Sequence, residues 1–67
     1  MKHPQPWQVW REKAHQEKSF RILMRATFRD EELVIYTPQK GISAPIVDEL
    51  TYFLERFEPQ PKQHPNE

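Results

Sequence analysis

Alternating apolar and polar positions mark the clearest strand in the sequence. The stretch FRILMRATF places an apolar side chain at every second position, namely at Phe20, Ile22, Met24, Ala26 and Phe28. Successive side chains of an extended chain point to opposite faces, so this spacing predicts a strand whose apolar face covers the core. The opposite face of the same strand would carry Arg21, Leu23, Arg25 and Thr27, followed by Arg29.

A second strand is predicted just after the first, in the sequence LVIYT, which is rich in β-branched and aromatic residues. Antiparallel pairing that keeps the apolar sets together places Phe28 opposite Leu33 and Arg25 opposite Tyr36. The connecting segment Arg29–Glu32 has no glycine or asparagine. We therefore expect a four-residue connection built on a type I turn rather than a two-residue turn.

A change of period near the C-terminal end predicts an amphipathic helix from Ser43 to Phe57. Its apolar residues recur at helical spacing, at Ile46, Val47, Leu50, Phe53, Leu54 and Phe57. Ser43 is suited to cap the start of this helix, Pro45 fits its first turn, and Pro59 would force its end.

The segment 7–18, WQVWREKAHQEK, is consistent with two structures. Its Glu, Lys, Ala and Gln content favours a helix, with Trp7, Trp10 and Ala14 on one stripe. Trp7 and Val9 also alternate with Gln8 and Trp10, as a third antiparallel strand requires. We expect the helix, because residues 14–19 lack the residues typical of a hairpin turn. The predicted fold is a small α+β domain, an antiparallel hairpin of two or three strands packed on a C-terminal amphipathic helix.

Proline-rich sequences at both ends limit the predicted domain to residues 7–57. Residues 1–6 and 58–67 contain HPQP and EPQPKQHPNE, with few apolar side chains to bury, and we expect both to be disordered tails. No apolar stretch is long enough for a membrane span or a signal peptide. The sequence therefore predicts a cytoplasmic protein with no membrane partner.

Charge is distributed unevenly along a chain whose formal net charge is zero. Residues 1–29 carry seven basic and two acidic side chains, and residues 30–67 carry three basic and eight acidic ones. This asymmetry suits contact between two halves of one molecule, contact between two copies, or a basic surface for an acidic partner. With 67 residues and no cysteine, the domain is stabilised by one small core alone, which makes a partner an expected source of stability.

The sequence contains no pattern typical of a catalytic, cofactor or metal site. None of His3, His15 and His64 has a partner at metal-ligand spacing, and the acidic cluster Asp30–Glu32 lacks the spaced ligands of a calcium loop. Gly41 is the only glycine, which is too few for a phosphate-binding loop. We therefore expect a protein that is not an enzyme and that binds neither a cofactor nor a metal ion.

The face of the hairpin opposite the core is the candidate binding surface. Its predicted members are Arg21, Leu23, Arg25, Arg29, Val34 and Tyr36. Arginine and tyrosine often anchor protein interfaces, so the sequence predicts a small regulatory protein-interaction module that forms a homodimer or binds another protein. The alternative function is a nucleic-acid-binding regulator that uses Arg21, Arg25 and Arg29 on phosphates and bases. It also stays open that these arginines are only the polar cover of a strand.

Overall fold

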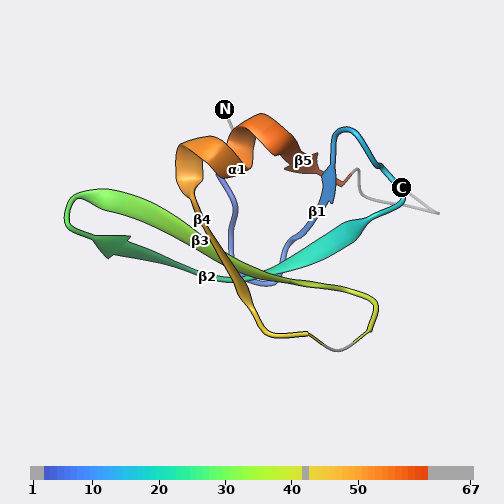
Figure 1. Ribbon diagram of the computed structural model, residues 1–67, viewed down its shortest axis with the longest axis horizontal. Coiled ribbons are helices and arrows are strands. Elements are labelled where there is room, and N and C mark those ends of the chain that lie inside the picture. The colour runs from blue at the N-terminus through green and yellow to red at the C-terminus, as the bar shows by residue number, and fades with distance from the viewer. Residues whose placement is uncertain (1–2, 42, 61–67) are drawn as a thin grey trace, which may run out of the picture.

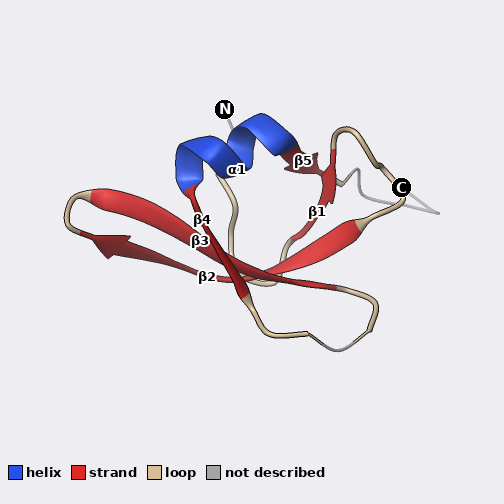
Figure 2. Ribbon diagram, viewed as in Figure 1, coloured by secondary structure: helices blue, strands red, loops and turns tan. Residues whose placement is uncertain are grey.

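A five-stranded antiparallel sheet forms most of the computed structural model, which describes residues 3–41 and 43–60 (Figures 1 and 2). The strands are β1 (Val9–Glu12), β2 (Ser19–Phe28), β3 (Glu31–Pro38), β4 (Ile46–Glu49) and β5 (Phe57–Pro59). The single helix among the described residues, α1 (Leu50–Arg56), connects β4 to β5. The sheet order is β4-β3-β2-β1-β5, so the chain follows a meander and then returns β5 to the far side of β1.

The predicted fold, a hairpin packed on a C-terminal helix, is wrong. The described chain forms five strands, and its helix has only seven residues. Residues 46–49, expected in the first turns of the helix, form β4 instead, with Ile46 opposite Tyr36 and Val47 opposite Ile35. A β-branched pair next to the open edge of β3 favours pairing over helix formation. The helix N-cap is Glu49, whereas Ser43 donates its hydroxyl to the Ala44 carbonyl.

The N-terminal segment is extended, and the expected helix over residues 7–18 is absent. β1 pairs with β2, with Val9 opposite Arg21 and Trp10 opposite Phe20. The connection back to β2 is closed by backbone hydrogen bonds from Glu12 N to Lys18 O, 3.2 Å, and from Lys18 N to His15 O, 2.9 Å. Backbone hydrogen bonds therefore close the connection without the residues typical of a hairpin turn, and β1 can form as a third strand of the sheet.

The β2–β3 hairpin has a two-residue turn, and the four-residue connection expected from the sequence is wrong. Phe28 lies opposite Glu31, and the intervening Arg29 and Asp30 have φ angles of 52° and 66°. Positive φ at both central residues is the geometry of a type I′ turn, which suits the right-handed twist of paired strands. Arg25 consequently lies opposite Val34 rather than Tyr36.

A β-bulge at Leu23 divides β2 into two parts with opposite orientation. The pairing passes from Ile22 opposite Tyr36 to Met24 opposite Ile35, so Leu23 is an extra residue on its strand. Ile22 is fully buried, whereas Met24 is 51% exposed. One additional residue exchanges the two faces of a strand, so the predicted continuous apolar face of β2 is wrong beyond Ile22.

The core lies between the sheet and α1, which covers one side of β3 (Figure 1). We call this side of the sheet the inner face. The buried core residues are Trp10, Ile22, Val34, Tyr36, Phe53 and Phe57, with Phe20, Leu50 and Leu54 packed against them. The Phe53 ring stacks on Phe57 with centroids 4.5 Å apart and lies 5.0 Å from Tyr36. The expected burial of Phe53 and Phe57 is confirmed, although Phe57 belongs to β5 and not to the helix.

Residues at both ends of the predicted domain take part in the fold. Pro4 is fully buried, although it lies in the segment expected to be a tail. Glu58 and Pro59 belong to β5, and Glu58 Oε2 lies 2.7 Å from Arg11 Nε on the neighbouring strand. The remaining residues of the predicted tails, 1–2 and 61–67, lie outside the described residues. Within the described chain, α1 is far too short to cross a membrane.

Candidate functional site

The structure separates the three arginines that were predicted to share one face. Arg21 precedes the bulge and lies opposite Thr37, on the side of the sheet away from α1, which we call the outer face. Arg25 follows the bulge and lies opposite the buried Val34, on the inner face. Arg29 occupies the turn. A continuous basic surface along β2 is therefore not formed.

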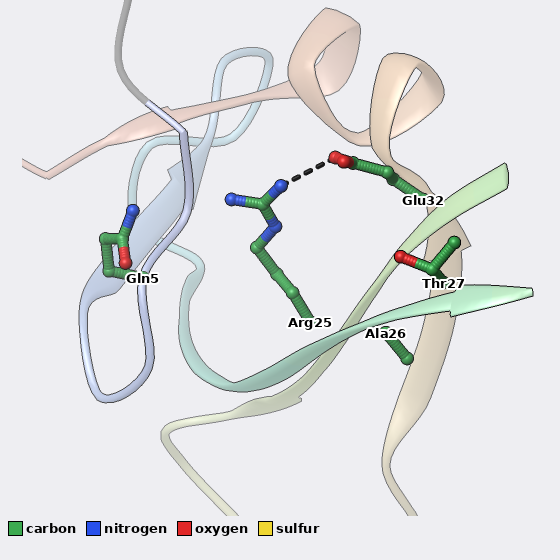
Figure 3. A pocket seen from close by; sticks show the side chains of 5 residues that line it. All are labelled: Gln5, Arg25, Ala26, Thr27 and Glu32. Atoms are coloured by element: carbon green, nitrogen blue, oxygen red, sulfur yellow. Dashed lines mark hydrogen bonds and ion pairs between the residues drawn. The ribbon is translucent and has the colours of Figure 1, made fainter. Parts of the chain in front are cut away.

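Arg25 lines an open hollow of about 340 Å³ near the turn end of the hairpin, together with Gln5, Ala26, Thr27 and Glu32. Figure 3 shows the Arg25 side chain directed at Glu32, with its Nη2 atom 2.6 Å from Glu32 Oε1. The arginine charge is thus already paired. Small-molecule sites are mostly apolar and enclosed, and this hollow is polar and open, so it does not form a convincing ligand site.

The other predicted binding residues have separate local roles. Arg21 donates from Nη1 to the Trp7 carbonyl over 3.0 Å, and the Arg29 guanidinium lies 5.2 Å from the centre of the Phe28 ring. Leu23 is the partly exposed bulge residue. Of the six predicted residues, only Arg29 is exposed, whereas Arg21, Leu23 and Arg25 are half-buried.

Val34 and Tyr36 are core residues, which corrects the prediction that they face outward. Val34 is 0% exposed and Tyr36 is 3% exposed. The Tyr36 hydroxyl donates to Asp48 Oδ2 over 2.5 Å. Burial, followed by this hydrogen bond to a carboxylate, raises the pKa of Tyr36 well above its ordinary value. Neither side chain is available to anchor a partner.

The structure instead gathers apolar side chains on the outer face of β2, β3 and β4. After the bulge, every second residue of β2 lies on this side. These residues lie opposite Ile35, Leu33 and Glu31 of β3, which alternate with the inward-facing residues of that strand. We call the following six residues the outer apolar face: Met24, Ala26, Phe28, Leu33, Ile35 and Val47. Three of them are more than half exposed, Met24 at 51%, Val47 at 53% and Phe28 at 59%.

These residues form adjacent rows across three strands. One row contains Met24, Ile35 and Val47, and the next contains Ala26 and Leu33, with Glu49 beside them on β4. An antiparallel sheet usually packs one face on the core and exposes a polar second face. This sheet is apolar on both faces, and large exposed apolar patches on soluble proteins commonly mark contact sites.

Charged residues lie on the border of the outer apolar face, at its two ends and on the edge strand β4. Glu31 lies opposite Phe28 on the neighbouring strand at the turn end, and Glu49 lies opposite Leu33 in the next row. Arg21 lies at the opposite end, beyond the bulge. Within residues 3–41 and 43–60, none of these three charges has an ion-pair partner within 4.0 Å. The face thus has an acidic end and a basic end.

This surface was not predicted, because Met24, Ala26 and Phe28 were expected in the core and Val47 in a helix. One signal was nevertheless present in the sequence. The run LVIY, residues 33–36, is apolar at four consecutive positions. A strand of this kind has apolar side chains on both of its faces, which is typical of a strand covered on both sides.

No group of three or more His, Cys, Asp or Glu side chains among the described residues is arranged to hold a metal ion. A second hollow, of about 280 Å³, lies at the other end of the hairpin, between Phe20 and Pro38 and beside Lys18 and Lys40. It is open to solvent and contains no buried polar group.

Comparison with known proteins adds no family to this description. No family model matches the chain, and neither a curated protein nor a solved structure shows significant similarity to it.

Proposed function

We propose that this protein is a small non-enzymatic interaction module that self-associates through the outer apolar face. The observation that carries this proposal is the exposure of Met24, Phe28 and Val47, each more than half exposed on the same side of the sheet. Covering these side chains removes apolar surface from water, and the free energy gained is about 25 cal/mol per Å² of apolar area buried. A domain of this size gains a useful share of its stability from such a contact.

A protein partner fits this surface better than nucleic acid does. The centres of protein interfaces are depleted of charge, and the charges of the outer apolar face lie on its border, at the two ends and at Glu49 on the edge strand β4. Nucleic-acid binding depends on several cations that follow a phosphate backbone. Arg21, Arg25 and Arg29 lie on different sides of the hairpin, and Arg25 is paired with Glu32. This distribution favours the protein partner.

Sedimentation of the wild-type protein and of Met24→Lys tests the proposal. We expect the wild-type protein to change from monomer to dimer between micromolar and millimolar concentration. The variant should stay monomeric over the same range, because an ammonium group at the centre of a closed interface loses its hydration. Circular dichroism should show that both proteins are folded, since Met24 lies outside the core.

The matched control is Tyr52→Lys. Tyr52 is 47% exposed and belongs to α1, which lies on the other side of the sheet from Met24. This variant should dimerise like the wild-type protein. A wild-type protein that is monomeric at every concentration, or a Met24→Lys variant that dimerises normally, would contradict the proposed function.

A further inference from the structure

We infer that the partner on the outer apolar face is a second copy of this chain, packed face to face about a two-fold axis that lies in the interface at right angles to the strands. In this arrangement Arg21 of each copy meets Glu31 of the other. The inference rests on the proposed function, and it adds the orientation of the two copies and the ion pairs that fix it.

The positions of the charges select this axis. A two-fold axis across the strands reverses the strand direction of the second copy, so the Arg21 end of one face covers the Glu31 end of the other. An axis parallel to the strands would instead place equivalent ends together, with arginine near arginine and glutamate near glutamate. Like charges in an interface are unfavourable, whereas opposite charges orient the partners.

The side chains along β2 and β3 are compatible with a two-fold axis at right angles to the strands. The axis passes between the row of Met24 and Ile35 and the row of Ala26 and Leu33. Met24 of one copy then covers Ala26 of the other, which sets a large side chain against a small one, as interdigitating sheets require. Arg21 comes to lie over Phe28 of the other copy, and the neighbouring Glu31 is about 4.8 Å to the side, one strand spacing away.

The charges that would form these pairs are available. Arg21 and Glu31 have no ion-pair partner within 4.0 Å in the part of the chain that the structure describes. The Arg21 guanidinium donates one hydrogen bond to the Trp7 carbonyl and keeps further donors for a carboxylate. A close pair across the interface therefore does not require any intramolecular ion pair to break.

The size of the face indicates a weak dimer. A rise of about 3.3 Å per residue over eight residues and a spacing of about 4.8 Å over three strands give an area of roughly 400 Å². Standard interfaces bury about 800 Å² on each partner. The face therefore corresponds to the smaller class of interfaces, which suits a dissociation constant in the micromolar range or weaker.

Charge reversal at both ends of the face tests the orientation by sedimentation equilibrium at low ionic strength. Arg21→Glu and Glu31→Arg should each weaken dimerisation about tenfold or more, because each creates two like-charged pairs. The double variant, Arg21→Glu with Glu31→Arg, should return to within a few-fold of the wild-type affinity. Added salt should weaken the wild-type dimer and strengthen the single variants.

Lys13→Glu is the net-charge control for Arg21→Glu, because it makes the same charge change at an exposed residue outside the outer apolar face. It should leave the affinity within a few-fold of wild type. A double variant that dimerises more weakly than both single variants would overturn the proposed orientation of the two copies. A monomeric Met24→Lys variant in the same series would still support the proposed function. A wild-type protein that does not associate, or a Met24→Lys variant that dimerises normally, would overturn both.

Discussion

The hydroxyl of Tyr36 donates a hydrogen bond to Asp48 Oδ2 over 2.5 Å, and this contact joins the core of the sheet to its edge. Tyr36 belongs to β3 and packs against Phe53 and Phe57, whereas Asp48 belongs to β4, the outermost strand on that side. β4 has only four residues, of which Ile46 and Val47 are exposed. The hydrogen bond therefore fixes a short edge strand that contributes little to the buried core.

Tyr36→Phe should destabilise the protein by about 1–2 kcal/mol, because it keeps the ring and removes the donor to a carboxylate. Asp48 would then be left beside the core without its partner. The midpoint of urea unfolding, with the slope unchanged, measures this loss. A variant as stable as the wild-type protein would show that water replaces the phenol at no cost.

Stability should also fall in alkaline solution because of Tyr36. Its pKa is raised in the folded protein above the ordinary value of 10.0, first by burial and then by Asp48. Above pH 10 the unfolded chain releases this proton while the folded protein retains it, so the unfolded state is favoured as pH rises. The stability that the protonated Tyr36 contributes to the folded protein is complete below pH 10 and is lost at higher pH.

The unfolding free energy, measured from about pH 9 to about pH 11, tests this dependence. Tyr36→Phe is the matched variant, since it cannot ionise at this position. Its stability should fall less steeply over that range than the stability of the wild-type protein. Parallel curves for the two proteins would contradict the assignment.

Phe53→Ala should unfold the domain or nearly so. Phe53 is 0% exposed and its ring contacts Trp10, Tyr36 and Phe57. Removing a buried phenylalanine side chain costs about 3–5 kcal/mol, and a chain of this length has a total stability of roughly 3–10 kcal/mol. Thermal denaturation followed by circular dichroism measures the loss, and Phe53→Leu supplies a milder step if the alanine variant does not fold.

Phe28→Ala is the matched control for the core substitution. It removes the same side chain from a position that is 59% exposed. In dilute solution, where the proposed dimer is dissociated, it should change the stability by less than about 1 kcal/mol. Equal losses of stability in Phe28→Ala and Phe53→Ala would contradict the structure, in which Phe53 is buried and Phe28 is exposed.

The turn between β2 and β3 should be improved by replacing Arg29-Asp30 with Asn-Gly. Both residues have positive φ, at 52° and 66°, which costs an ordinary side chain about 1–2 kcal/mol. Glycine also adds freedom to the unfolded chain, so we expect a net gain of about 1 kcal/mol. The urea midpoint should rise with an unchanged slope.

Glu17→Gly is the control for the turn, because Glu17 lies in the connection between β1 and β2 and does not have positive φ. There the glycine should lower stability by about 0.4–1 kcal/mol. A loss of stability in the Asn-Gly variant as well would show that the Arg29 side chain contributes more to the turn than its backbone costs.

The two central strands could be predicted from the sequence, because both their alternation and their β-branched content are local properties. The helix could be predicted only in part. Apolar spacing identified Phe53 and Phe57 as buried, but it assigned Phe57, Ile46 and Val47 to the same helix, whereas all three belong to strands. The structure of Ile46 and Val47 is decided by the open edge of β3, and pairing partners ten and twelve residues away do not appear in a local pattern.

The candidate surface could not be predicted, because two local irregularities determine which side chains share it. Apolar residues occur at every second position from Phe20 to Phe28, and this alternation continues in the sequence across the bulge at Leu23. The tight turn at Arg29 and Asp30 contains none of the glycine or asparagine that usually indicates it. Each irregularity changes the register, so the pattern predicted the strands correctly and their faces incorrectly.

The bulge at Leu23 also makes this part of β2 tolerant of a change in chain length. Deleting Leu23 would place Met24 directly after Ile22, and the two strands would then pair residue by residue with the partners that they already have. Met24, Ala26 and Phe28 would stay on the outer face and Arg25 on the inner face, because successive residues of a strand alternate between the faces. A single lost codon at this position would thus straighten the strand and leave its two sides unchanged, whereas the loss of a neighbouring residue would remove a side chain that one of the faces uses.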